Sequence, residues 1–94
     1  MVKEIIWRKK AIARFQKIVD YLQSEWSAKV AEEFIEEVEQ LETILLSHPY
    51  SGSESKERNY RKLVLTKHNT VIYKVKGNKV FILSINDNRS KNIF

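Results

Sequence analysis

The chain has 94 residues, of which 43% are apolar and 31% charged, and this composition predicts one folded domain over residues 1–94. A chain this short buries only about 60–65% of its unfolded surface, so a second domain is not expected. There is no cysteine, which excludes a disulfide framework and a thiolate metal site and favours a reducing cytoplasm. No apolar run reaches the roughly 18 residues of a membrane span, so we expect a cytoplasmic protein that does not enter the membrane.

The net charge of +5 is concentrated in the second half of the chain. Residues 1–52 carry 7 Lys/Arg and 9 Asp/Glu, whereas residues 53–94 carry 10 and 3. Such a polarised charge attracts nucleic acid or an acidic protein partner by long-range steering. A surface that serves only solubility would have the same composition, so both interpretations stay open.

The first half predicts a short strand followed by two helices. Residues 2–7 (VKEIIW) favour a strand, and from Arg8 to about Trp26 apolar residues recur at steps of three and four, which is typical of an amphipathic helix. Ser27 can cap the next helix, which runs from Ala28 to about Ser47 with the same apolar period. The short connection predicts an antiparallel helical hairpin with one shared apolar side.

The polar side of the second predicted helix is rich in glutamate. Metal ligands converge on a pocket, whereas these carboxylates surround the outer side of an amphipathic helix, so we expect a solvated face without a metal. The residues are Glu32, Glu33, Glu36, Glu37, Glu39 and Glu42.

After Pro49 the apolar period changes to about two, which predicts three consecutive strands over residues 60–67, 70–76 and 79–86. Gly77-Asn78 is expected to form a tight hairpin turn, because glycine readily adopts a positive φ, and His68-Asn69 is expected to form the preceding turn. The predicted fold is α+β, with the order β-α-α-β-β-β and the helical hairpin packed on an antiparallel sheet.

The first of these strands opens with cations: Arg58, Arg61 and Lys62. Side chains alternate along a strand, so either Arg61 or Lys62 must project toward an apolar sheet face. If helices cover one face only, an arginine can lie on the other and reach outward with its guanidinium.

The chain end supplies Arg89 and Lys91, which could join these cations to hold a phosphate or a partner's carboxylates. The alternative is that the arginine pairs locally with a carboxylate of Glu54, Glu57 or Asp87. The sequence leaves both interpretations open.

The aromatic residues have structural interpretations. Trp7 and Trp26 continue apolar patterns and are expected to pack in the core or at a helix end. Tyr60 and Tyr73 lie on predicted strands in the basic half, where stacking on a nucleobase is conceivable but packing is favoured.

The whole pattern resembles the toxins of the RelE/ParE superfamily from bacterial type II toxin-antitoxin modules, also known for plasmid stabilisation. The resemblance rests on the opening IIW, the helix ARFQKIVDYL, the loop HPYSG, the basic strand YRKLVL, and the strands VIYKV and VFILSINDNR, in that order. It implies growth inhibition by a protein that a cognate antitoxin neutralises in a hetero-oligomer. It implies no cofactor.

Two mechanisms are known within the superfamily. RelE-like members cut mRNA on the ribosome, and the resemblance would make Arg61 and Arg89 the catalytic cations, with Arg58, Lys62 and Lys91 binding phosphate or target. The usual Tyr or His near the last strand is missing here, and His68, Glu54 or Glu57 would have to replace it.

ParE-like members instead inhibit DNA gyrase by binding, which needs no acid and base. We favour this mechanism slightly over the endoribonuclease because the proton-transfer groups are missing. A non-toxic nucleic-acid-binding domain is the third interpretation.

Overall fold

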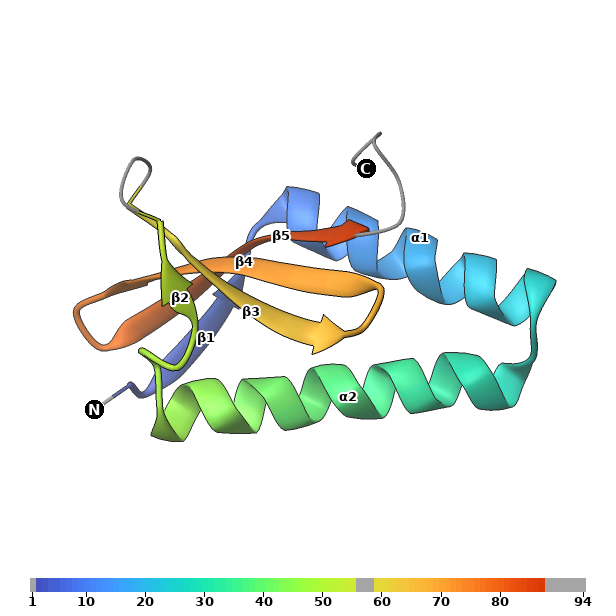
Figure 1. The fold of residues 1–94 in the computed structure, drawn as a ribbon, viewed down its shortest axis with the longest axis horizontal. Helices are drawn as coiled ribbons and strands as arrows, with labels where there is room; N and C mark the ends of the chain where they lie inside the picture. Colours follow the sequence, from blue (N-terminus) through green and yellow to red (C-terminus); the bar gives the residue numbers. More distant parts are fainter. Residues whose placement is uncertain (1, 56–58, 88–94) are drawn as a thin grey trace.

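The computed structural model describes residues 2–55 and 59–87, which form two helices and a five-stranded sheet (Figure 1). Within these ranges both helices contribute to one core on the same face of the sheet. The elements in chain order are β1 (Glu4–Trp7), α1 (Lys9–Glu25), α2 (Ala28–Ser47), β2 (Ser53–Glu54), β3 (Arg61–Thr66), β4 (Asn69–Lys76) and β5 (Lys79–Asp87).

The spatial order of the strands is β1-β5-β4-β3-β2, with β1 parallel to β5 and all other pairs antiparallel. The predicted α+β fold, a helical hairpin on a mostly antiparallel sheet, is confirmed. The sequence prediction missed β2, because two residues are too few to show a period. No partner was predicted for the first strand. β1 pairs with β5, at the other end of the described chain, and this pairing depends on how the helices and the later strands pack.

The helix boundaries follow the predicted signals. Ser27 is the N-cap of α2, and its Oγ accepts a hydrogen bond of 3.1 Å from the backbone amide of Val30. Trp26 is the C-cap of α1 and His48 that of α2. The two helices are thus separated by only two residues, as the sequence indicated.

The two hairpin turns of the sheet differ in how well the sequence located them. Gly77 has a φ of +62°, so the predicted positive backbone angle is confirmed. The β3–β4 turn consists of Lys67 and His68, one residue earlier than expected, because Asn69 already pairs with Thr66. The hydroxyl of Thr66 fixes this turn by accepting hydrogen bonds of 3.1 Å from the His68 backbone amide and 3.1 Å from the Asn69 side chain.

The core lies between the helices and one face of the sheet. Tyr73 and Val71 on β4 and Ile82 on β5 are almost completely buried against the apolar sides of α1 and α2. Trp7 packs edge-on against Phe15, with 5.7 Å between ring centroids, and its Nε1 donates to Glu42 at 3.0 Å. The predicted core role of Trp7 is therefore confirmed.

The helical hairpin is longer than the sheet it covers. The turn between α1 and α2 extends well beyond the β3–β4 turn (Figure 1). The inner sides of both helices near this turn therefore have no strand beneath them. In the part of the chain that the structure describes, neither helix combines the length and apolarity needed to cross a bilayer.

Candidate functional site

Arg61 lies on the helix-covered face of the sheet, at the start of β3. It is paired directly with Tyr73, and Leu63 with Val71, and opposite residues of an antiparallel pair project to the same face. Lys62, which pairs with Ile72, projects to the other face and is exposed. The hypothesis that Arg61 reaches out from an uncovered face is therefore wrong, because the alternation places Lys62 there instead.

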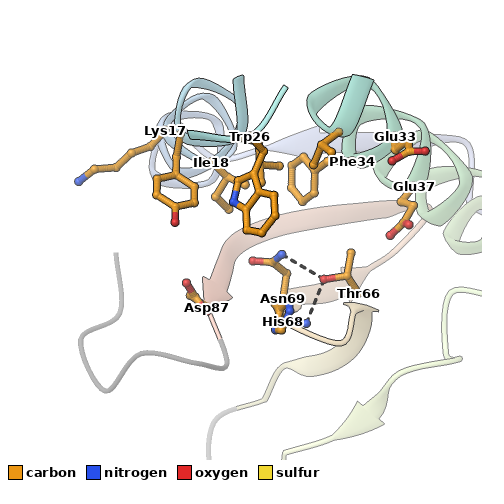
Figure 2. Close-up of a pocket in the computed structure, with 13 residues that line it drawn as sticks. Lys17, Ile18, Trp26, Glu33, Phe34, Glu37, Thr66, His68, Asn69 and Asp87 are labelled. Atoms are coloured by element: carbon orange, nitrogen blue, oxygen red, sulfur yellow. Dashed lines mark hydrogen bonds between the residues drawn. The ribbon is translucent and has the colours of Figure 1, made fainter. Parts of the chain in front are cut away.

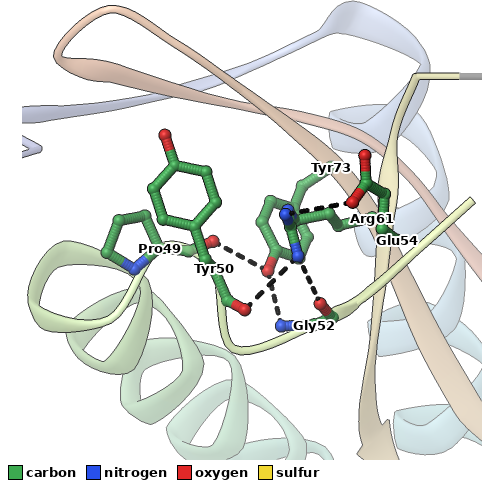
Figure 3. Close-up of polar contacts among 6 residues, drawn as sticks. All are labelled: Pro49, Tyr50, Gly52, Glu54, Arg61 and Tyr73. Carbon is green, nitrogen blue, oxygen red and sulfur yellow. Dashed lines mark hydrogen bonds and ion pairs between the residues drawn. The ribbon is translucent and has the colours of Figure 1, made fainter.

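The guanidinium of Arg61 holds the loop between α2 and β2 (Figure 3). Its Nη1 donates to the carbonyl oxygens of Gly52 at 2.8 Å and Tyr50 at 3.4 Å, and its Nη2 lies 3.6 Å from a carboxylate oxygen of Glu54. The group also lies over the Tyr50 ring, 4.8 Å from its centroid. Only 21% of the Arg61 side chain is exposed. Local pairing with Glu54, one of the two alternatives left open by the sequence, is what the structure contains.

The hydroxyl of Tyr73 binds the same loop from the neighbouring strand. It accepts a hydrogen bond of 2.8 Å from the backbone amide of Gly52 and donates one of 2.9 Å to the carbonyl of Pro49. The side chain is fully buried, which confirms its predicted packing role. Burial raises the pKa of Tyr73, and the Gly52 amide and the Arg61 charge oppose that rise only in part.

Gly52 is required at this point by lack of space. A Cβ there would lie 2.6 Å from the carbonyl oxygen of Lys62 and 2.7 Å from the hydroxyl of Tyr73. The loop can therefore approach β3 and β4 only because residue 52 has no side chain. We call the set of residues that fixes this loop the loop clamp: Pro49, Tyr50, Gly52, Glu54, Arg61 and Tyr73.

The remaining predicted site residues do not gather around Arg61 within the described ranges. Arg58, Arg89 and Lys91, the other residues proposed for phosphate or target binding, lie outside the described residues, as does Glu57. The predicted meeting of Arg61 with Arg89 therefore stays a prediction.

The substitutes for a catalytic acid or base are also poorly placed. His68 lies in the β3–β4 turn, at the other end of β3 from Arg61, and six strand residues span about 20 Å. Glu54 is engaged by the guanidinium itself. The carboxylates of α2 are mostly exposed, and no group of three or more His, Asp or Glu able to hold a metal ion lies in residues 2–55 and 59–87.

A second feature is a large groove of about 730 Å³ between the overhanging end of the helical hairpin and the β3–β4 turn (Figure 2). Ile18 and Phe34 form its buried floor, while Tyr21 and Trp26 remain 48% and 66% exposed at its edge. We call it the apolar groove. The predicted packing of Trp26 at a helix end is wrong in one respect, because the ring lines a groove and remains largely open to solvent.

The polar rim of the apolar groove is mostly acidic. Glu33 and Glu37 line the α2 side and Asp87 the end of β5, while Lys17 contributes one positive charge from α1. Exposed aromatic rings beside a concave apolar surface are typical of protein-binding sites. This groove was not predicted from the sequence, although the position of Trp26 at the break between the two helices was a usable signal.

A protein-family model matches residues 5–91, and its description is "ParE toxin of type II toxin-antitoxin system, parDE". The chain belongs to the ParE toxin family. This ParE toxin therefore comes from a type II toxin-antitoxin system, as the resemblance to the RelE/ParE superfamily implied. No match was found among curated proteins.

Solved structures support the same fold for this ParE toxin. The chromosomal ParDE system from P. aeruginosa contains a chain of TM-score 0.76 and 22% identity, with 93% of this chain and 96% of that chain covered. The YoeB/ParE toxin from Agrobacterium tumefaciens has a TM-score of 0.64 at 12% identity, covering 90% and 98%. The YoeB-YefM complex from Staphylococcus aureus has a TM-score of 0.61 at 13% identity, covering 90% and 94%.

The two glycines allow a test of the loop clamp. Gly52→Ala should destabilise the fold by more than Gly77→Ala, because its Cβ meets backbone and a buried ring, whereas a Cβ at Gly77 meets no atom within 4 Å. Gly77→Ala should cost about 1–2 kcal/mol for the positive φ alone. Denaturant unfolding measures both, and equal losses would contradict the close approach at Gly52.

Tyr73→Phe tests the buried hydroxyl. Removing it leaves the Gly52 amide and the Pro49 carbonyl without this partner, and we expect a loss of about 1–3 kcal/mol in the free energy of unfolding. Tyr21→Phe, an exposed tyrosine on α1, is the matched control and should change little.

The same variant tests the ionisation of Tyr73. Because burial raises its folded-state pKa above the ordinary value of 10.0, the stability it contributes is complete below pH 10 and is lost as the pH rises through the folded-state pKa. The stability difference between the wild type and Tyr73→Phe should therefore shrink above pH 10. A difference that stays constant would show that the hydroxyl is not buried.

Proposed function

We propose that this ParE toxin arrests growth by binding DNA gyrase and does not cleave RNA. Membership of the ParE family supports the proposal. The observation that carries it is the engagement of Arg61, whose guanidinium contacts two carbonyls, a carboxylate and an aromatic ring of its own chain. An arginine used in this way stabilises a loop and is poorly available to a substrate phosphate.

RNA cleavage by a 2′-hydroxyl would need a base, a cation for the developing phosphorane charge and an acid, all within hydrogen-bond reach of one phosphate. His68 lies far from Arg61 along β3, and Glu54 is paired with the guanidinium. Inhibition by binding needs only a rigid complementary surface. A loop held by hydrogen bonds from the neighbouring residues Tyr73 and Arg61 can supply one with little further ordering cost.

We propose further that the cognate antitoxin packs an apolar segment into the apolar groove. The similar structures include a ParDE system and a YoeB-YefM complex, in which toxin and antitoxin occur together. The groove lies where the helical hairpin has no strand beneath it, so a partner's side chains would complete the core. Glu33 and Glu37 on its rim favour a segment that carries Lys or Arg beside its apolar residues.

Purified protein tests the choice between the two targets. The wild type should inhibit DNA supercoiling by gyrase and leave mRNA on translating ribosomes intact. Arg61→Gln, assayed at a temperature where it is still folded, should keep inhibition within a few-fold, since the arginine serves the loop and not the target. Cleavage of ribosome-bound mRNA by the wild type, abolished in Arg61→Gln, would establish the nuclease instead.

Trp26→Ala tests the antitoxin proposal. Tryptophan is enriched among the residues that dominate binding energy, and one whose exposed ring becomes buried by a partner commonly contributes about 2 kcal/mol, so affinity for the antitoxin should fall by about 30-fold. Val64→Ala is the control, because Val64 is also 66% exposed but lies on the opposite sheet face. Calorimetry with the purified pair measures both, and equal affinities for Trp26→Ala and the wild type would place the antitoxin elsewhere.

A further inference from the structure

The sheet face turned away from the helices carries a concentration of positive charge. Its members are assigned by strand register, beginning from the β4 residues Val71 and Tyr73, which project into the core. The alternate β4 residues Lys74 and Lys76 therefore project to the other face. We call the set on this side the basic face: Arg8, Lys62, Lys74, Lys76, Lys79 and Phe81.

The remaining members follow from their cross-strand partners. Lys62 pairs with Ile72, Phe81 with Lys74, and Lys79 with Lys76, so all three project to the same side as those β4 residues. Arg8, just beyond β1, joins them because its guanidinium carbon lies 5.2 Å from the centroid of the Phe81 ring.

The carboxylates on the described strands neutralise little of the positive charge on this face. Glu54 pairs with Arg61 on the helix-covered face, and Asp87 lines the apolar groove. Glu4 lies 3.9 Å from Lys79, with both side chains about half exposed. A surface pair of this kind contributes little, so it neutralises the face only weakly.

The arrangement of cations is unfavourable in the free protein. Lys76 and Lys79 are directly opposite each other on β4 and β5, and like charges in that relation destabilise a sheet. The Lys74 ammonium lies 5.9 Å from the centroid of the same Phe81 ring that Arg8 contacts, so both cations lie beside one ring. A bound polyanion would relieve the repulsion between Lys76 and Lys79.

We propose that the basic face binds the phosphate backbone of a nucleic acid. Four of its five cations are lysines, which are depleted at protein interfaces but serve well as point charges toward phosphate. An acidic protein segment would need large apolar anchors. This face offers only the exposed Val64 and the part-buried Phe81 among the described residues, whereas the exposed aromatic rings of Tyr21 and Trp26 line the apolar groove. The inference goes beyond the proposed function, because it concerns a different face of the molecule and holds whatever protein the toxin binds.

The test uses the purified full chain and fluorescently labelled oligonucleotides: single-stranded DNA, single-stranded RNA and duplex DNA. The wild type should bind at least one of them, with an affinity that falls linearly in a log–log plot against salt. Lys62→Gln/Lys76→Gln, two exposed positions of the basic face, should weaken binding at least about tenfold at ~0.1 M salt and lower the salt slope by about 2.

Lys10→Gln/Lys29→Gln is the matched control, because both residues are exposed on the helices and the net charge falls by the same amount. It should bind like the wild type, and all variants should unfold at similar temperatures. The proposal is overturned if the wild type binds none of the oligonucleotides at ~50 mM salt. It is also overturned if the two double variants lose the same affinity for them. A third contrary result is that polyglutamate competes as effectively as an oligonucleotide of equal charge. That result would identify the basic face as a binding site for acidic proteins and would also overturn the proposal.

Discussion

The hydroxyl of Tyr73 lies between two backbone groups of the loop that follows α2, accepting from the Gly52 amide and donating to the Pro49 carbonyl. The chain leaves the helical layer here and must return to the edge of the sheet. Its backbone polar groups would be costly to bury without partners. Tyr73 supplies those partners from the centre of β4, and Arg61 closes the same loop from β3.

The described residues form three surface regions with different physical properties. The polar groups of the loop clamp are internally satisfied, since its cation, its carboxylate and its hydroxyl all have partners within the chain. The apolar groove is the opposite, because exposed rings such as Trp26 line a concavity where the helices extend past the sheet. The basic face is a third region, with one repulsive cross-strand pair, Lys76 and Lys79. Each region suits a different kind of contact.

Local sequence signals predicted most of the fold. Ser27 capped α2 as expected, and Gly77 made the tight turn, because both depend on neighbouring backbone atoms alone. The site was predicted less well. Both interpretations of Arg61 were identified, but choosing between them needed the face to which the strand turns that residue. Tyr73 was expected to pack, yet its bond to Gly52, 21 positions away, leaves no periodic trace in the chain.

The sequence by itself determined the two amphipathic helices, the strand-rich second half and the unequal distribution of charge, because these follow from residue type and spacing. Only the tertiary structure decided which sheet face the helices cover, and hence that Arg61 is turned inward and Lys62 outward. It also decided that Trp26 lines an open groove, since the length of the hairpin relative to the sheet emerges only when the two layers pack. The physical reason is common to both cases: burial depends on contacts between segments that are distant in the chain.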